Sequence, residues 1–359
     1  MTFCIAPFVN VHVNPVGIVK PCCLFKGSDI IRTPNEAFYS KDWDEIRSRM
    51  LSDEILPECE SCDNDKTAIG FFEDDFPTYR DWFNHRYKFD GAFEIKSVDL
   101  SRSNKCNFKC IICGWDRSSL WYETEKEVSK IVPRLDVPIA SDARVMPDIV
   151  GEKEISVDVD EIDFTQVDNI ALLGGEPLID KKIYKILDDV KINSHLFIST
   201  NCSVSPLKIP INKFKSVVIN ISIDGLNNVG EDVRYGLNTK RFMKNLNEWI
   251  TLSKNHEDFK IRYHYVLHNL NAYNSKETEQ ILLSTGHGKF SLDVLKYPRY
   301  LSPRILPEEI NIPVKVRNRK FNKKECINFI KFIDYMKTKQ DFHTETLKIY
   351  DILKTKIKL

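Results

Sequence analysis

Residues 97–113, SVDLSRSNKCNFKCIIC, place a short strand directly before a cysteine-rich loop. Ser97–Ser101 has the composition of a buried strand, and Cys106, Cys110 and Cys113 follow it in a C-x3-C-x2-C spacing. Three thiolates on one loop can each bind one iron of a [4Fe-4S] cluster and leave the fourth iron open for another ligand. The alternatives are three thiols that are close only by chance and a structural zinc knuckle.

Outward from this loop, apolar runs alternate with longer amphipathic stretches. Strands that alternate with helices predict a parallel sheet of βα units, and six units make an open, partial (β/α)6 barrel, a TIM-like α/β fold. The expected strands are Ser97–Ser101, Asn169–Leu173, His195–Thr200, Ser216–Asp224, Phe259–His268 and Lys289–Tyr297. The expected helices are Asp180–Asn193, Lys240–Lys254 and Lys276–Ser284.

Three segments with different patterns divide the chain. Residues 1–92 are predicted to form a small cysteine-containing module, residues 93–300 the partial barrel, and residues 301–359 a basic helical extension. A Pro- and Asp-rich stretch, residues 132–168, interrupts the barrel pattern and is predicted to be a surface insertion. In the extension, apolar residues recur at helical spacing and are expected to pack on the barrel: Cys326, Phe329, Ile330, Ile333 and Met336.

Composition restricts the classes of protein that fit. The 359 residues are 42% hydrophobic and carry 52 basic and 52 acidic side chains, so a folded chain with no global attraction for nucleic acid or membranes is expected. No apolar run reaches the roughly 18 residues of a spanning helix, and the N-terminus lacks a secretory signal pattern. We therefore expect a cytoplasmic protein, in which the ten cysteines serve as metal ligands or buried residues rather than disulfides.

The end of the second predicted barrel strand carries LGGEP, residues 173–177. Glycines allow close approach of a ligand to the backbone, and the carboxyl ends of barrel strands hold the sites of such folds. With CNFKCIIC, STN at 199–201, SIDG at 222–225 and the segment DVRYGLNTKRFMKNL, the chain resembles the radical S-adenosylmethionine (radical SAM) superfamily over about residues 95–300.

This resemblance implies a cofactor set and a binding site. Cys106, Cys110 and Cys113 are expected to hold a [4Fe-4S] cluster whose open iron binds S-adenosylmethionine (SAM). The cluster would donate an electron to SAM, and the resulting 5′-deoxyadenosyl radical would abstract hydrogen from a substrate. The SAM-binding residues implied are Gly174, Gly175 and Glu176 at the methionyl amine, Thr200 or Asn201 and Ser222 or Asp224 at the ribose, Arg234 at the carboxylate, and Phe108 and Ile112 beside the cluster and adenine.

A second set of cysteines lies near the N-terminus: Cys4, Cys22, Cys59 and Cys62. The spacing from Cys4 through Gly17 to Cys22 resembles the twitch and SPASM modules, which hold auxiliary iron–sulfur clusters and usually follow the barrel rather than precede it. A single auxiliary cluster, [4Fe-4S] in type, is predicted, and a structural zinc site is the alternative. Gly17 is expected in a hairpin turn, and Cys23 is expected to be a buried thiol that points away from the cluster.

Substrate contacts are sought on the fifth predicted strand. Its period of two places Arg262, His264, Val266 and His268 on one face, which we predict to line the cavity. His264 is a candidate catalytic residue, and the alternative is that the histidines of this face are ordinary core or rim residues. Cys202 is a candidate hydrogen-atom donor, but we favour a small buried residue at this position.

The resemblance favours a peptide or protein substrate, modified after translation by an oxidoreductase or modifying enzyme. The alternatives are an oxidoreductase or epimerase acting on an aminosugar or nucleoside, a sulfur-inserting or methylating enzyme, and a zinc-stabilised binding protein without activity. A flavodoxin or ferredoxin is the expected electron donor. No membrane partner is expected, and the basic stretch Lys315–Lys324 is interpreted as a solvated connector rather than a nucleic-acid site, because Phe321 is its one aromatic residue.

Overall fold

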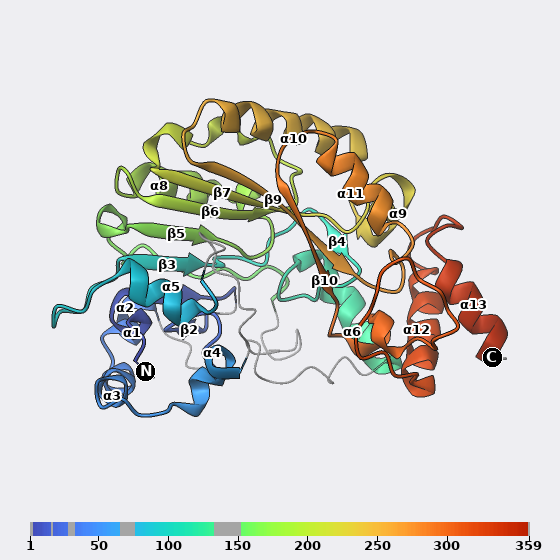
Figure 1. Cartoon of the computed structure of the whole chain (residues 1–359), viewed down its shortest axis with the longest axis horizontal. Coiled ribbons are helices and arrows are strands. Elements are labelled where there is room, and N and C mark those ends of the chain that lie inside the picture. The colour runs from blue at the N-terminus through green and yellow to red at the C-terminus, as the bar shows by residue number, and fades with distance from the viewer. Residues whose placement is uncertain (1–2, 16, 28–32, 65–75, 133–151, 358–359) are drawn as a thin grey trace.

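An eight-stranded, mostly parallel sheet forms the centre of the protein. The computed structural model describes residues 3–15, 17–27, 33–64, 76–132 and 152–357 (Figure 1). The strands lie in the order β10-β9-β7-β6-β5-β3-β1-β2. Their bounds are β1 (Asn10–Val13), β2 (Val19–Lys20), β3 (Ser97–Leu100), β5 (Asn169–Leu172), β6 (His195–Thr200), β7 (Ser216–Ser222), β9 (Phe259–Leu267) and β10 (Lys289–Val294).

The six strands expected from the sequence are all present and adjacent. From β3 through β5, β6, β7 and β9 to β10, each strand of this series pairs in parallel with the next one in the series. This is a mixed α/β fold with an open, curved sheet, as the alternating pattern predicts (Figure 1).

Helices cover one face of the sheet, which we call the outer face. The helices of the structure are α1 (Ala6–Val9), α2 (Pro34–Phe38), α3 (Lys41–Leu51), α4 (Glu60–Asn64), α5 (Tyr79–Arg86), α6 (Tyr122–Ile131), α8 (Lys181–Asp189), α9 (Asn227–Val233), α10 (Thr239–Lys254), α11 (Ser275–Leu283), α12 (Lys323–Met336) and α13 (Lys348–Ile357). The expected helices between strands correspond to α8, α10 and α11, which lie along this face in Figure 1.

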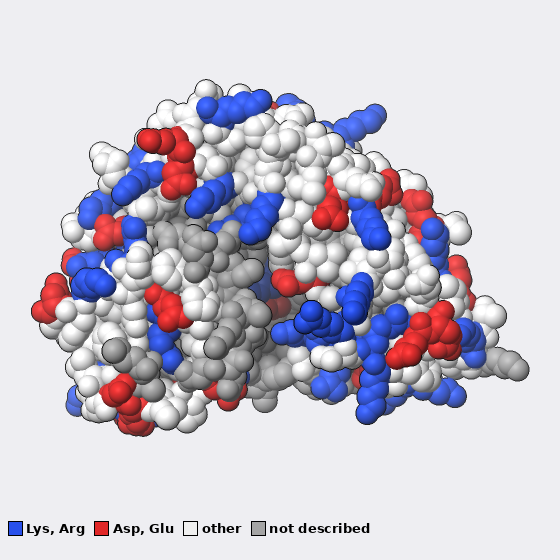
Figure 2. Space-filling model, in the orientation of Figure 1, with Lys and Arg blue, Asp and Glu red and all other residues white. Residues whose placement is uncertain are grey.

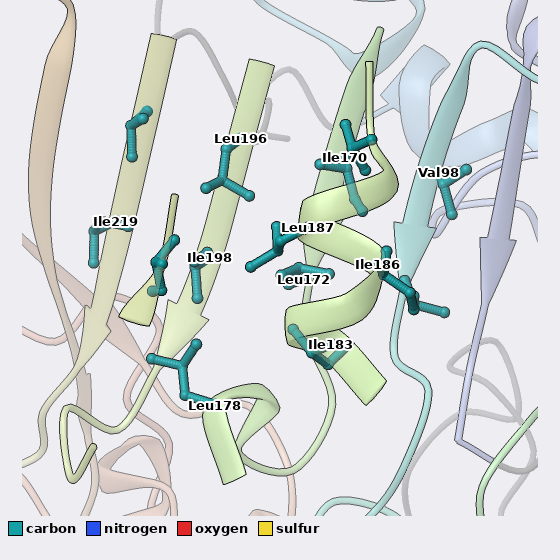
Figure 3. Close-up of a cluster of buried hydrophobic side chains, with 14 of the residues drawn as sticks. Val98, Ile170, Leu172, Leu178, Ile183, Ile186, Leu187, Leu196, Ile198 and Ile219 are labelled. Atoms are coloured by element: carbon teal, nitrogen blue, oxygen red, sulfur yellow. The ribbon is translucent and has the colours of Figure 1, made fainter. Parts of the chain in front are cut away.

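The packing of α8 shows why this face is stable. Asp180 caps the helix by accepting a hydrogen bond from the Lys182 amide, and Ile183, Ile186 and Leu187 follow at helical spacing. These three side chains lie among apolar side chains of β3, β5 and β6 in Figure 3. Each fully buried aliphatic side chain of this kind contributes about 1.5–3 kcal/mol.

The opposite, inner face is divided into two halves. Ala171 of β5, Phe197 of β6 and Val218 of β7 are buried in one apolar cluster with Phe8, Trp82 and other N-terminal residues. The N-terminal segment therefore covers the amino-terminal half of the inner face. Towards the carboxyl ends of the strands, the inner face is only partly buried, and apart from Val266 its partly buried residues are mainly polar: Ser199, Asn220, Ser222, His264 and Ser291.

The N-terminal strands continue the main sheet. β1 pairs in parallel with β3, and β2 pairs antiparallel with β1. Gly17 has a φ of 85° in the turn between β1 and β2, so the expected hairpin glycine is confirmed. A boundary near residue 92 stays a prediction, but the segment before it shares the sheet of the segment after it.

The predicted surface insertion is partly a structural element. Residues 133–151 lie outside the described residues. In residues 152–168, exposed side chains alternate with the buried side chains of Ile155, Val159 and Ile162, and the Val157 amide donates to the Arg102 carbonyl at 2.8 Å. The surface insertion stays a prediction, and these buried apolar side chains anchor its described part to the fold.

The C-terminal segment forms two helices, α12 and α13, at the end of the molecule opposite the N-terminus (Figure 1). The five apolar residues expected to share one face are all buried in a cluster that also contains Tyr265 and Leu267 of β9. None of the described helices has the length and apolar character to span a membrane.

A buried pair on the inner face provides a pH test of this fold. Asp99 of β3 lies opposite His12 of β1, and burial raises the pKa of the Asp99 carboxyl to about 6. The unfolded chain loses this proton near the ordinary pKa of 3.8, so the folded state binds more protons between these values and stability falls as pH rises through about 4–6.

Asp99→Asn removes this ionisation. We expect the stability of the variant relative to the unchanged protein to rise by about 1–2 kcal/mol between pH 5 and pH 8, measured by urea unfolding at both pH values. Parallel pH dependences of the two proteins would contradict the assignment.

Candidate active site

Functional candidates gather where the parallel strands end. The loops after β3, β5, β6, β7 and β9 carry, respectively, the cysteine triplet, Glu176, Asn201, Asp224 and His268. Because parallel strands end at one edge of a sheet, residues distant in sequence meet there. We call this the carboxyl edge.

The three cysteines of the loop lie together. Cys110 and Cys113 are joined by a thiol hydrogen bond, which lowers the pKa of Cys110 despite burial, and Cys106 interacts electrostatically with both. Burial raises the pKa of the Cys106 thiol to about 12. Metal binding replaces the thiol proton, so a site with this chemistry is suited to a metal group that stabilises thiolates.

The cysteine loop is held by backbone pairing and by buried side chains. A short strand, β4 (Lys109–Cys110), pairs antiparallel with β8 (Arg234–Tyr235), and the Ile111 amide donates to the Val233 carbonyl at 2.8 Å. The indole nitrogen of Trp121 donates to the Cys110 carbonyl at 2.9 Å. The Ser118 hydroxyl donates to the Phe108 carbonyl at 2.6 Å. The loop is thus fixed before any cofactor is added.

The two glycines of LGGEP allow a close approach between two backbone segments, while their expected place beside the SAM amine stays a prediction. A Cβ atom on Gly175 would lie 2.1 Å from the Lys105 carbonyl oxygen, and one on Gly174 would lie 2.8 Å from the Ser103 carbonyl oxygen. The amides of Gly175 and Glu176 donate to these same two carbonyls. The absence of side chains therefore lets the β5 turn pack against the start of the cysteine loop, and the neighbouring space is filled by protein.

Glu176 is buried, and its carboxylate is already hydrogen-bonded. It accepts from the Thr200 hydroxyl at 2.9 Å, from the Asn201 amide at 2.6 Å and from the Leu178 amide at 3.1 Å. Burial nevertheless raises its pKa to about 7. The carboxylate therefore positions the end of β6 against the β5 turn.

Asp224 and Arg234 form a buried ion pair beside the cysteines. Arg234 Nη1 lies 2.7 Å from Asp224 Oδ2, and the other carboxylate oxygen accepts from the Val266 amide at 3.0 Å. Burial opposes the charge of Arg234, but Cys110, Asp224 and Cys113 raise its pKa above the ordinary value. Arg234 Nε is buried without a hydrogen-bond partner among the described residues.

His268 is a second buried group whose polar atom has no partner. Its Nδ1 accepts from the Leu270 amide at 3.2 Å, while Nε2 is buried without a partner among the described residues. Burial lowers the pKa of His268 to about 4, with Asp224 and Arg234 as its charged neighbours. The imidazole is therefore neutral at pH 7, and because Nδ1 accepts, the proton lies on Nε2.

The remaining predicted SAM contacts occupy different positions. Asn201 lies at the cysteines, because its side-chain amide donates to Asn107 Oδ1 at 3.0 Å and approaches Cys106 Sγ at 3.8 Å. Thr200 instead faces Glu176, and Phe108 is a core residue with Arg234 over its ring. Ser222 and Ile112 are partly buried, Ser222 on the inner face.

Cys202 does not lie in the cavity. Its side chain is fully buried in the outer-face core, with its thiol 3.9 Å from the Phe242 carbonyl of α10. The favoured interpretation of Cys202 as a small buried residue is therefore confirmed, and the candidate role as hydrogen-atom donor is not supported. The chain turns at Cys202, whose φ is 59°.

His264 is placed in the open half of the inner face. Its side chain is 33% exposed, and Nε2 lies 2.9 Å from Asp293 Oδ2 on β10. The alternating residues Ile261, Tyr263 and Tyr265 are buried on the other face, so the predicted orientation of this strand is confirmed.

The four N-terminal cysteines surround one small cavity, which also has Tyr79, Arg80 and Phe83 in its wall. Burial, with smaller contributions from Cys59 and Cys62, raises the pKa of Cys4 to about 12. Burial raises the pKa of Cys22 as well, with contributions from the other three. Cys23 is partly buried rather than buried as expected, and it forms a hydrogen bond with Tyr79.

The two cysteine sets can be compared with the iron–sulfur clusters that the sequence predicts. In the described part of the chain, no three Cys, His, Asp or Glu side chains are close enough to hold one metal ion. Cys106, Cys110 and Cys113 lie on one loop, and the four N-terminal cysteines line one cavity. Both sets consist of thiols, the donors that iron–sulfur clusters use. None of the ten cysteines, all of which are described, forms a disulfide.

Sequence reasoning missed several residues of this region. Nothing indicated that His268 has an unpartnered nitrogen or that Asn107 links the cysteine loop to β6. It also missed Asp232, a buried residue of α9 that accepts from the His343 amide at 2.8 Å and from His343 Nδ1 at 3.0 Å. The Thr346 hydroxyl donates to the same carboxylate. These contacts join segments that are about one hundred residues apart, so no local pattern reveals them.

Comparisons with known proteins give structural matches alone. No family model matches the sequence, and no curated protein matches it. The structure anSMEcpe with bound AdoMet is 17% identical, with a TM-score of 0.35 over 66% of this chain and 56% of that one. TYW1 with a lysine-pyruvate adduct is 15% identical (TM-score 0.30, 64% and 70% covered), and Streptococcus suis SuiB is 15% identical (TM-score 0.32, 66% and 45% covered).

The chain thus spans less than three fifths of the length of anSMEcpe. Similarity at this level says nothing of the activity of this chain, which has to be argued from its own residues.

The Asp232 contacts predict that the C-terminal segment stabilises the site. Asp232→Ala leaves the donors of His343 and Thr346 without an acceptor, so we expect a loss of about 2–4 kcal/mol in urea unfolding and faster proteolysis within residues 337–347. Glu345→Ala, at an exposed position next to Thr346, is the matched control and should change neither measurement. An Asp232→Ala protein that resists protease like the control would show that these contacts do not anchor the segment.

Proposed function

We propose that the chain is a radical SAM enzyme that cleaves S-adenosylmethionine reductively and abstracts hydrogen from a substrate. The observation that carries the proposal is the meeting of Cys106, Cys110 and Cys113 at the carboxyl edge beside the buried cation Arg234. No fourth cysteine joins them among the described residues, so a cubane held there has one iron for another ligand.

When bound, the cluster and SAM supply one electron and a 5′-deoxyadenosyl radical for hydrogen abstraction. The residues of the chain bind and orient these groups. Cys106, Cys110 and Cys113 hold the cluster, and Arg234 offers its unpartnered Nε to an anionic group such as the SAM carboxylate. Asp224 keeps the Arg234 guanidinium in place through the 2.7 Å ion pair.

Three further residues complete this proposed binding site. The neutral His268 offers an Nε2–H donor next to Asp224 and Arg234. Asn201 contacts the cluster cysteine Cys106, and Ser222 lies on the open inner face, where the ribose is proposed to bind. Glu176 acts indirectly, by holding the segment that carries Asn201.

The substrate is proposed to enter the open half of the inner face, where His264, paired with Asp293, is positioned to exchange a proton with it. The polar lining suits a peptide or protein side chain and, as the alternative, an aminosugar or nucleoside. We further propose that Cys4, Cys22, Cys59 and Cys62 hold one auxiliary cluster. Four thiol ligands leave no open iron, which favours electron transfer over substrate binding.

The cysteine assignments are tested by cluster loading. After anaerobic reconstitution we expect about eight irons per chain and formation of 5′-deoxyadenosine with dithionite and SAM. The variant with alanine at positions 106, 110 and 113 should keep about four irons and form no 5′-deoxyadenosine. Cys326→Ala, which changes a buried core cysteine, is the control and should keep both clusters and the activity.

The other possible outcomes of the reconstitution experiment distinguish between the alternatives. Loss of all iron in the triple variant would contradict two separate sites. Four irons with stoichiometric zinc and activity retained would make the N-terminal set a structural zinc site. Zinc alone, with no 5′-deoxyadenosine, would favour the binding protein without activity.

His268 is tested by two isosteric changes. His268→Asn keeps an acceptor near Nδ1 for the Leu270 amide but removes the Nε2 donor, so we expect SAM binding to weaken about 5–30-fold in equilibrium dialysis, with thermal stability preserved. His268→Gln keeps a donor near Nε2 and should bind SAM within about threefold of the unchanged protein while losing stability. Equal SAM affinity in both variants would remove His268 from the site.

A further inference from the structure

A groove lined by cations lies just beyond β10. Lys296, Arg299, Arg304 and Lys320 line it together with Tyr297 and Phe321, and its volume is about 400 Å³. No acidic residue lines this cavity. We call it the cationic groove.

A second, larger cavity adjoins the cationic groove. It has a volume of about 760 Å³ and shares Lys320 and Phe321 with the first one. Arg319, Lys323 and Lys356 add three further cations, while Glu308 and Glu309 bring two carboxylates, of which Glu309 pairs with Lys356 at 2.8 Å. The two cavities adjoin at Lys320 and Phe321, and we call the pair the trough. Figure 2 shows Lys and Arg side chains gathered on the lower right of the visible face, where Figure 1 draws the segment around α12.

Part of this charge is not paired within the described residues, whereas Lys356 pairs with Glu309 and Arg319 donates to the Ile310 carbonyl at 3.1 Å. Arg304, Lys320 and Lys323 form no ion pair with any residue that the structure describes. Arg304 Nε is buried and has no hydrogen-bond partner among these residues. Like charges held close together without counter-charges favour an anionic ligand.

The aromatic residues give the trough a second kind of contact. The Phe321 side chain is 51% exposed between the two cavities, although phenylalanine is usually buried. The Tyr297 ring lies in the wall of the groove with the Arg299 guanidinium over it at 5.6 Å. The two aromatic residues are more than twenty positions apart in sequence, so the fold creates an aromatic pair that the sequence alone did not indicate.

We propose that this trough binds a single-stranded nucleic acid, with phosphates on the cations and a base on Phe321. A track of cations interleaved with exposed aromatic rings is the combination that binds single strands, because every base has a face for stacking. An acidic peptide would use the charges but leaves the exposed Phe321 unexplained. The net charge of zero does not oppose this, because phosphate contacts depend on local charge.

The trough is fixed to the carboxyl edge of the sheet. The Leu295 amide donates to the Leu267 carbonyl at 2.9 Å, and the Asn269 amide donates to the Leu301 carbonyl at 2.9 Å. Asn269 follows His268 directly, so the segment that forms the groove is bonded to the strand end that carries the candidate site. The inference goes beyond the proposed function and holds whether or not the cysteines carry clusters.

Fluorescence anisotropy with a labelled uridine oligomer of about 12 nucleotides tests the proposal. Between about 50 and 200 mM salt, the logarithm of the affinity should fall with a slope of about −2 to −3, as expected for three or four phosphate contacts on a single strand. Lys320→Glu with Lys323→Glu should weaken binding at least about tenfold and reduce this slope. Phe321→Ala should weaken binding about tenfold with the slope unchanged.

The matched control is Lys181→Glu with Lys185→Glu, which makes the same change in net charge at exposed positions of α8. It should bind within about twofold of the unchanged protein. Equal weakening by the control, or no binding at about 100 μM protein, would overturn the proposal. So would an oligomer affinity that Phe321→Ala leaves unchanged, or displacement of the oligomer by poly-glutamate at equal charge, which would identify an acidic-peptide surface.

Discussion

The buried carboxylate of Glu176 is the group on which the arrangement of the carboxyl edge depends. It lies in the turn after β5, and it accepts hydrogen bonds from Thr200 and Asn201 at the end of β6. The glycines before it lie against the backbone of the cysteine loop so closely that a side chain would not fit. Three segments are thereby held at one point. A charge buried without partners costs several kcal/mol, so the three donors around Glu176 are a condition for the edge to form.

The sheet itself could be predicted from the sequence, because strands that alternate with helices leave a local signal. All six expected strands were found, and so was the hairpin glycine at position 17. The position of β1 beside β3 was not predicted, since strand pairing between residues 10 and 97 depends on contacts that no local pattern encodes. For the same reason the covered half of the inner face was missed.

The candidate site was also predicted in part: residues within a local sequence motif were predicted, and residues that act through distant contacts were not. The cysteine spacings predicted which thiols meet, because each set is nearly contiguous or has a recognisable motif. The burial of Cys202 agrees with the favoured interpretation, but the positive φ of its backbone was not predicted. His268 was missed because its buried Nε2 lacks a hydrogen-bond partner among the described residues, which only the structure shows. Asp232 was missed because its partner His343 is far away in the sequence. The same holds for Tyr297 and Phe321, which the fold brings to one groove.

The bond between Asp232 and the segment around His343 has a consequence for the order of events during synthesis. Asp232 lies two residues before Arg234, whose strand pairs with the cysteine loop. The segment that fixes Asp232 leaves the ribosome more than a hundred residues later. The sheet and the N-terminal cysteines can therefore assemble while translation continues, whereas the cysteine loop gains its last brace only afterwards.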